Sequence, residues 1–265
     1  MNVAVDIGNT RVKVGWFEGD TLCDQWQLPR LSDLDLSKTD RSVEAVILSS
    51  VAEASLAAAS EQLRQHRPPS TPIIVLSGYT PLPFVNRYIT PSTLGTDRLA
   101  AVAGAQRLHS RQNALVIDAG TCITYDVIDQ EGAYQGGLIS PGVQMRLRAM
   151  HTFTARLPLV KLEADRQDSH ELTERSTDAG LRSGAVWGAA AEINQMIRMY
   201  ADKFSDLRVM LCGGDASYLL PYVGGAATGM PVTGMPATGV PVTLVSELIL
   251  IGLNSILQYN VNQKN

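Results

Sequence analysis

One short motif occurs twice in this chain, and its repetition constrains the fold more than any other feature. In the first copy, Val3–Val14, an apolar run ends at Asp6 and is followed by Gly8, after which apolar and polar residues alternate. This pattern predicts a β-hairpin, because glycine supplies the backbone freedom of a tight turn and alternation is typical of a half-buried strand. In the second copy, Ala114–Val127, Asp118 takes the place of Asp6. Two copies predict two related halves.

The turn of the first copy has the chemistry of a phosphate-binding site. Exposed backbone N–H groups, the hydroxyl of Thr10 and the ammonium of Lys13 can bind a phosphate chain. The carboxylate of Asp6 can bind the metal ion that accompanies it. For a single copy, an ordinary hairpin with a solvated aspartate is the better interpretation. The second copy at Asp118 favours the phosphate site.

This pair of motifs resembles the actin, Hsp70 and sugar-kinase superfamily, whose ribonuclease-H-like halves hold ATP between them. The resemblance implies an α/β fold of two ribonuclease-H-like (actin-like ATPase) half-domains with mixed sheets and an ATP cleft between them. We expect the halves to span residues 1–112 and 113–265. Residues 228–242 repeat a Thr-Gly-Met-Pro-Val pattern every five residues, and we expect a loop insertion there because recurrent proline prevents a helix.

Bulk properties exclude several classes of partner. The 265 residues are 45% hydrophobic, which is enough for substantial cores, and the net charge is −4 without a dense Lys/Arg cluster. Nucleic acid and membrane surfaces are therefore not expected as partners. The three cysteines form no C-x-x-C pair, which favours a reducing compartment. No apolar run approaches the roughly 18 residues of a membrane helix, and no signal peptide precedes the first strand, so we expect a soluble cytoplasmic protein.

The sequence also predicts helices at several places. Leu99–Leu108 is expected to be a helix whose N-terminus carries Asp97 and Arg98, where the partial positive charge of the helix favours an anion. Helix capping by Thr96 or Asp97 is the alternative interpretation. Further helices are expected at residues 52–65, 143–150, 185–204 and 245–259, the last of them docked on the second half. Gly136–Gly142 is too rich in glycine and proline for an ordinary strand.

Taken together, the motifs resemble one family of that superfamily. They comprise D-x-G-N-T at Asp6, Y-x6-G-x-D-R at Tyr88, D-A-G-T at Asp118, G-G-x-I-x-P-G at Gly136, the segment that starts at Thr177, and G-G-D-A at Gly213. The set resembles type III pantothenate kinase over nearly the whole chain, except for the pentapeptide repeat. The G-x-x-x-x-G-K-[ST] motif of P-loop kinases does not occur.

The resemblance implies a role for each motif. Asp97 is the proton acceptor, and Asp118 binds a monovalent cation, K⁺ or NH₄⁺. ATP, accompanied by Mg²⁺, is bound by Asp6, Ile7, Gly8, Asn9, Thr10, Arg11, Val12, Lys13 and Thr121. Pantothenate is bound by Tyr88, Gly95, Thr96, Asp97, Arg98 and Thr177. Similar enzymes are homodimers, so a homodimer is expected here as well.

The implied reaction is the ATP-dependent phosphorylation of pantothenate to 4'-phosphopantothenate, the first step of coenzyme A biosynthesis. Phosphoryl transfer requires positioning, charge neutralisation and a base. Lys13 and Mg²⁺ would neutralise the developing charge, and Asp97 would orient or deprotonate the primary hydroxyl of pantothenate. Arg98 would pair either with the pantothenate carboxylate or with Asp97, and the sequence does not decide between them.

Two other functions are open at this point. A phosphatase, or a kinase of another small alcohol, would keep both phosphate turns, and ADP release without an acceptor would identify hydrolysis. A non-catalytic regulator is the third hypothesis, because some family members are described as accessory factors in gene regulation. The presence of Asp6, Asp97, Asp118 and Arg98, and the lack of a basic surface signature, argue against a regulator.

Overall fold

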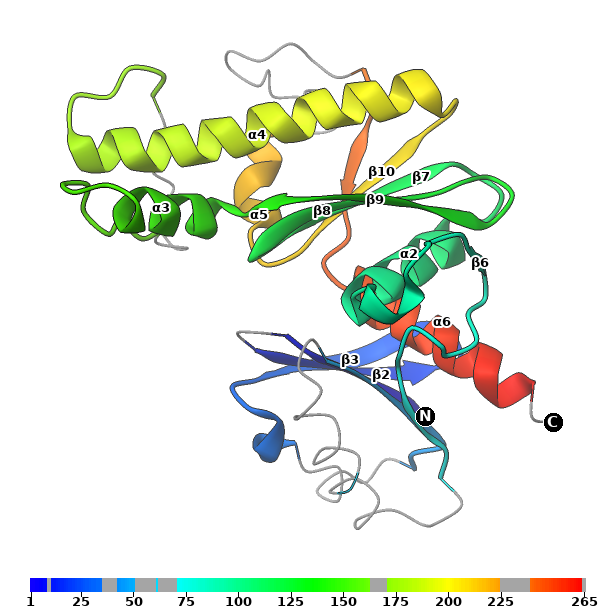
Figure 1. Cartoon of the computed structure of the whole chain (residues 1–265). Helices are drawn as coiled ribbons and strands as arrows, with labels where there is room; N and C mark the ends of the chain where they lie inside the picture. Colours follow the sequence, from blue (N-terminus) through cyan, green and yellow to red (C-terminus); the bar gives the residue numbers. More distant parts are fainter. Residues whose placement is uncertain are drawn as a thin grey trace. The chain divides into compact units, whose positions relative to one another are not determined.

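The chain has an α/β fold, shown as a computed structural model in Figure 1. The structure describes residues 1–8, 11–34, 42–50, 61, 71–162, 171–224 and 239–263. Contacts divide the chain into two compact units, which we describe separately. Unit 1 comprises Met1–Arg111, Gln130–Gly136 and Glu247–Asn265, and unit 2 comprises Gln112–Asp129 and Gly137–Ser246.

Unit 1 is built on a mixed sheet with the strand order β3-β2-β1-β4-β5. The strands are β1 (Asn2–Ile7), β2 (Val12–Glu18), β3 (Thr21–Leu28), β4 (Ala45–Ser50) and β5 (Ile73–Val75). The first motif forms the predicted hairpin, with β1 antiparallel to β2, and β1 also pairs in parallel with β4. β1 and β4 are central strands buried on both faces, which explains their continuous apolar runs.

In the described part of unit 1, the structure has the helices α2 (Thr96–Leu108) and α6 (Leu248–Asn262) and the short elements β6 (Val85–Asn86), η1 (Leu31–Asp33) and η3 (Pro91–Thr93). The two helices pack against each other at close range. A Cβ on Gly252 would lie only 1.7 Å from the carbonyl oxygen of Ala100. Glycine at this position therefore lets the two helix backbones touch.

The last helix does not dock where we expected. The prediction that it packs on the second half is wrong, since α6 packs on α2, β1, β4 and β2 of unit 1. Helical periodicity identifies an apolar face but not the sheet that this face covers. The predicted boundary between two related half-domains, at residues 112 and 113, stays a prediction.

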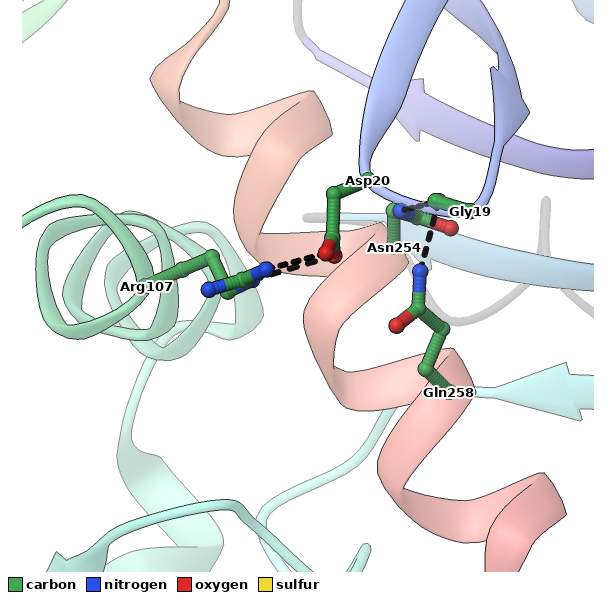
Figure 2. Close-up of polar contacts among 5 residues, drawn as sticks. All are labelled: Gly19, Asp20, Arg107, Asn254 and Gln258. Carbon is green, nitrogen blue, oxygen red and sulfur yellow. Dashed lines mark hydrogen bonds and ion pairs between the residues drawn. The ribbon is translucent and has the colours of Figure 1, made fainter.

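Polar contacts also attach α6 and α2 to the turn between β2 and β3 (Figure 2). Asn254 and Gln258 of α6 both donate side-chain hydrogen bonds to the carbonyl oxygen of Gly19, at 2.9 and 2.6 Å. Arg107 of α2 donates through Nε to Asp20 at 3.0 Å and forms an ion pair with the same carboxylate. The hydrogen bond from Arg107 holds the pKa of Asp20 below its usual value.

Unit 2 contains most of the second sheet, whose strand order is β11-β10-β7-β8-β9-β6. Its strands are β7 (Ala114–Ala119), β8 (Cys122–Ile128), β9 (Ala133–Pro141), β10 (Arg208–Cys212) and β11 (Val242–Leu244). β7 is antiparallel to β8 and parallel to β10, so this sheet is also mixed, as predicted. The first residues of β9 belong to unit 1, where they pair with β6.

Helices cover the sheet of unit 2 and bury an extensive apolar cluster. They are α3 (Val143–Thr152), α4 (Thr177–Lys203), α5 (Ala216–Leu219) and the short η4 (Leu220–Tyr222). Figure 1 shows α3 beside one end of the long helix α4. α4 begins eight residues before the predicted start at residue 185, because Ser176 caps its N-terminus and accepts a hydrogen bond from the Ala179 N–H at 3.3 Å.

The glycine-rich segment 136–142 corrects a second expectation, because residues up to Pro141 belong to strand β9. A Cβ on Gly137 would lie 1.7 Å from the carbonyl oxygen of Tyr125 on β8. Glycine is needed there for a close backbone approach and does not mark a break in the strand. No helix among the described residues is long and apolar enough to cross a membrane. Most of the predicted helix at 52–65 and the repeat up to residue 238 lie outside the described residues.

Candidate active site

Asp6 lies near the end of the central strand β1, between two polar neighbours. The strand register pairs it with Lys13 on β2 and with Ser49 on β4. The side chain is buried, with 9% of the residue exposed, and burial raises the pKa of Asp6 to about 6. The charge of Lys13 lowers this pKa and that of Asp97 raises it. A buried carboxyl whose charge is only partly compensated is typical of a functional site.

The N-terminus of α2 is anchored beside this strand end. Ser49 Oγ donates to Thr96 Oγ1 at 3.0 Å, and Thr96 Oγ1 donates to the carbonyl oxygen of Ser50 at 3.2 Å. These bonds fix the first residue of α2 to the last two residues of β4, whose neighbouring strand carries Asp6. The hydroxyl of Thr96 therefore anchors the start of α2 to β4.

Asp97 follows in the first turn of α2. Its Oδ1 accepts a hydrogen bond from the backbone N–H of Arg98 at 2.8 Å. The N-cap residue is Gly95, with no side-chain cap, so the capping alternative does not describe Thr96 or Asp97. A Cβ on Gly95 would lie 2.3 Å from Asp97 Oδ1, so glycine leaves room for the carboxylate. The electrostatic effect of Asp97 on Asp6 brings two predicted site residues into one neighbourhood.

Arg98 and Tyr88 form the next part of the site. Arg98 is only 6% exposed, and its guanidinium carbon lies 5.5 Å from the centre of the Tyr88 ring. Tyr88 in turn stacks on the buried Tyr134 of β9, with ring centres 6.0 Å apart and planes 9° apart. Gly136 has a left-handed φ of 92°, and a Cβ there would lie 3.7 Å from the Tyr88 ring. The stack gives Arg98 a fixed platform.

The remaining residues of the first motif shape the hairpin turn. The Gly8 N–H donates to the carbonyl oxygen of Arg11 at 3.2 Å, and the exposed Arg11 donates to Gln27 Oε1 at 3.0 Å. Ile7 and Val12 are buried and pair with each other across the hairpin. Their backbone rather than their side chains therefore borders the turn. Asn9 and Thr10 lie outside the described residues.

Unit 2 carries the other three predicted site residues. Asp118 lies near the end of β7, Thr121 is exposed in the following turn, and Thr177 is the exposed first residue of α4. A Cβ on Gly213, whose φ is 100°, would lie 2.3 Å from Asp118 Oδ1. The predicted G-G-D-A turn therefore packs directly on the second motif.

Two further observations concern charge in unit 2. Asp215, two residues after Gly213, donates its backbone N–H to the carbonyl oxygen of Ala119 at 2.8 Å. Burial raises the pKa of the Asp215 carboxyl. Among the described ranges, no group of three or more His, Cys, Asp and Glu side chains gathers as a metal site. A cation at Asp118 would therefore need oxygen ligands from the backbone or from ATP in addition to this carboxylate.

Sequence reasoning did not single out two residues that the structure brings to the site. In the sequence, Ser49 only follows an apolar run that indicates a buried strand, and no neighbouring residue indicates that Thr96 is its partner. Tyr134 precedes the glycine motif by two residues, and that proximity was the available signal. Its stacking on Tyr88 depends on the pairing of β9 with β6.

Comparisons with known proteins agree with the geometry. A family model described as type III pantothenate kinase matches residues 2–199. A Cytophaga hutchinsonii protein described as a type III pantothenate kinase is 38% identical over 264 residues, which cover 98% of this chain and 100% of that protein.

Solved structures show the same architecture. A Campylobacter jejuni protein provisionally described as a Baf family transcriptional activator matches with a TM-score of 0.57 and 19% identity, covering 98% of this chain and 99% of that one. An inorganic polyphosphate/ATP-glucomannokinase from Arthrobacter sp. strain KM matches with a TM-score of 0.52 and 15% identity, covering 99% and 98%. At such identities the likeness shows the fold alone, and it confirms the predicted α/β fold with mixed sheets.

Proposed function

Because this chain belongs to the type III pantothenate kinase family, we propose that Asp97 is the base in its ATP-dependent phosphorylation of pantothenate. The chain is a phosphotransferase that acts in coenzyme A biosynthesis. The observation that carries the assignment of Asp97 is its placement in the first turn of α2, where its charge acts on the buried Asp6. An acid beside a metal-binding carboxylate is suited to receive the proton of an alcohol that attacks a bound phosphate.

The step balances with these groups. The hydroxyl oxygen of pantothenate attacks the γ-phosphorus of ATP, its proton passes to Asp97, and the bond from the γ-phosphorus to the bridging oxygen breaks to release ADP. Lys13, across the hairpin from Asp6, neutralises charge on the phosphates. The incompletely compensated Asp6 carboxyl suits a cation, and Mg²⁺ bound with ATP supplies further charge neutralisation there.

Arg98 is the group we assign to the pantothenate carboxylate. Its guanidinium lies over Tyr88, and its backbone N–H donates to Asp97 Oδ1. A guanidinium held on an aromatic platform loses little conformational freedom when it binds a carboxylate in a bidentate manner. Beside them, Gly95 leaves room for the Asp97 carboxylate and Thr96 anchors the start of α2 to β4.

Unit 2 supplies the remaining groups in this proposal. Thr121 and the backbone of its turn bind ATP, Asp118 binds K⁺ or NH₄⁺, and Thr177 contacts pantothenate. The half-buried position of Asp118 beneath the Gly213 turn supports a role other than solvation. We also propose that the enzyme is a homodimer, which the molar mass in solution tests directly.

The experiment that tests the proposed function measures ADP release with pantothenate, with other small alcohols and with no acceptor. Pantothenate should give the highest kcat/KM, and the rate without an acceptor should be near background. Asp97→Asn should lower kcat by about 10²- to 10⁴-fold. Asp20→Asn is the matched control, because this carboxylate lies in the β2–β3 turn and takes no part in the proposed site. ADP release that does not depend on an acceptor would replace the kinase assignment with hydrolysis.

A further inference from the structure

Four elements of unit 2 meet at the carboxylate of Glu192, which the proposed reaction does not use. Tyr125 Oη of β8 donates to Glu192 Oε1 at 2.8 Å, and Ser140 Oγ of β9 donates to the same oxygen. Arg146 of α3 donates to the other oxygen and forms an ion pair with it. The Arg146 and Glu192 side chains are only 24% and 22% exposed. Every oxygen of this carboxylate therefore has a strong partner.

The Glu192 carboxyl in this cluster is ionised. Burial raises the pKa of Glu192, but the hydrogen bonds from Ser140, Arg146 and Tyr125 outweigh it and hold this pKa below its ordinary value. A half-buried charge held by three partners fixes their positions, because releasing one of them leaves charge without compensation.

The cluster fixes the corner where β9 ends and α3 begins. Ser140 and Pro141 are the last residues of β9. Arg146, which is bound to Glu192, also donates through Nε to the carbonyl oxygen of Pro141 at 2.9 Å. The side chain of Arg146 therefore joins Glu192 to the backbone of the corner.

The corner lies directly against the second phosphate turn. The Gly142 N–H donates to the carbonyl oxygen of Thr121 at 3.2 Å. A Cβ on Gly142 would lie 2.1 Å from the carbonyl oxygen of Gly120, so only glycine allows this approach. A displacement of the corner would have to move the peptide groups of the turn with it.

We propose that Glu192 is a positioning residue for the nucleotide: through Arg146 and Ser140 it holds the β9–α3 corner on the Gly120–Thr121 turn, so that the turn keeps the geometry that binds phosphate. This inference rests on the proposed function, in which Thr121 contacts ATP. Phosphate binding by backbone N–H groups depends on their directions, so a small shift of the turn weakens it.

The test measures the Kd of a non-hydrolysable ATP analogue by calorimetry, together with KM for ATP and for pantothenate. Glu192→Gln keeps the size of the side chain and its acceptor for Ser140, but it removes the charge that holds Arg146. The Kd of the analogue and KM for ATP should rise about tenfold or more, while KM for pantothenate should change by less than about twofold. Ser140→Ala removes one donor and leaves the ion pair, so it should raise the Kd by only about threefold.

Ile197→Val is the matched control for a loss of stability alone. Ile197 lies on the same helix, is buried in the core of unit 2 and is not one of the four residues of the hydrogen-bond cluster. It should lower the unfolding midpoint and leave the Kd near that of the wild type. The inference is overturned if Glu192→Gln and Ser140→Ala bind the analogue as the wild type does, or if Ile197→Val weakens binding equally. A wild type that binds the analogue without phosphorylating pantothenate would refute the proposed function. The Kd values of the variants would still test whether Glu192 positions the turn.

Discussion

The buried carboxyl of Asp6 makes the stability of this protein depend on pH in a direction that can be measured. The folded chain raises the pKa of Asp6 from 3.8 to about 6, chiefly through burial. A raised pKa means that the folded state binds the proton more tightly than the unfolded state does. The stabilising contribution is therefore fully present below pH 3.8 and is lost as the pH rises through about 6.

The size of the effect follows from this shift. A difference of roughly two pKa units corresponds to about 3 kcal/mol of folding free energy that the ionised carboxyl costs near pH 8. Near pH 4.5 only about 1 kcal/mol of this cost is present, because most of the folded carboxyl is then protonated. Asp6→Asn is neutral at every pH. Its stability relative to the wild type should therefore increase by about 2 kcal/mol between pH 4.5 and pH 8.

Urea unfolding measures this change in unit 1. In a Trp187→Phe background, the two remaining tryptophans, Trp16 and Trp26, lie 5.1 Å apart in the sheet of unit 1, so their fluorescence reports that unit. The Asn variant should be more stable than its parent at pH 8 and inactive as a kinase, as expected when a site residue costs stability. A stability difference that is the same at both pH values would refute the account of Asp6.

Asp20→Asn is the control of opposite sign. Because Arg107 lowers the pKa of Asp20, its contribution is present above the unfolded pKa and is lost as the pH falls through the folded value. The Asn variant should therefore be slightly less stable than the wild type at pH 8, and the difference should disappear in acid. Asp20 is half exposed, so the effect should be small.

Three further predictions test other parts of the account. Tyr134→Leu should raise KM for pantothenate about tenfold with little change in KM for ATP, whereas Tyr134→Phe should keep the stack and the wild-type KM, as steady-state kinetics would show. Gly252→Ala should destabilise unit 1 by more than about 3 kcal/mol in urea, because its Cβ would meet the carbonyl oxygen of Ala100; a fully stable variant would contradict the close approach of the helices. Activity should be lost when Na⁺ replaces K⁺, and Asp118→Asn should abolish the response to K⁺; equal rates in both salts would remove the cation site from the proposal.

The sequence predicted the parts of the site that are local. A strand that ends in an aspartate and a glycine, and a helix that begins near Asp97, are each written in a few consecutive residues. The structure confirms the hairpin and the helix for this reason. The two copies of one motif carried the resemblance that implied mixed sheets, and the structure has two of them.

The parts that were missed depend on contacts between distant residues. Gly137 looked like a strand breaker because the carbonyl oxygen that it approaches belongs to Tyr125 on another strand. The docking of α6 on unit 1 involves two helices that lie far apart in the sequence, where Gly252 of α6 approaches the carbonyl oxygen of Ala100 on α2. The cluster at Glu192 joins four elements, and Tyr125 and Glu192 at its ends lie 67 positions apart in the sequence.

The most direct test of the central claim is a crystal structure of the enzyme with a non-hydrolysable ATP analogue, Mg²⁺ and pantothenate bound together. The measurement is the distance from the Asp97 carboxylate to the primary hydroxyl of pantothenate. We predict about 2.6–3.2 Å, with the hydroxyl oxygen facing the γ-phosphorus. A hydroxyl that contacts a different base, with Asp97 turned away from it, would contradict the account.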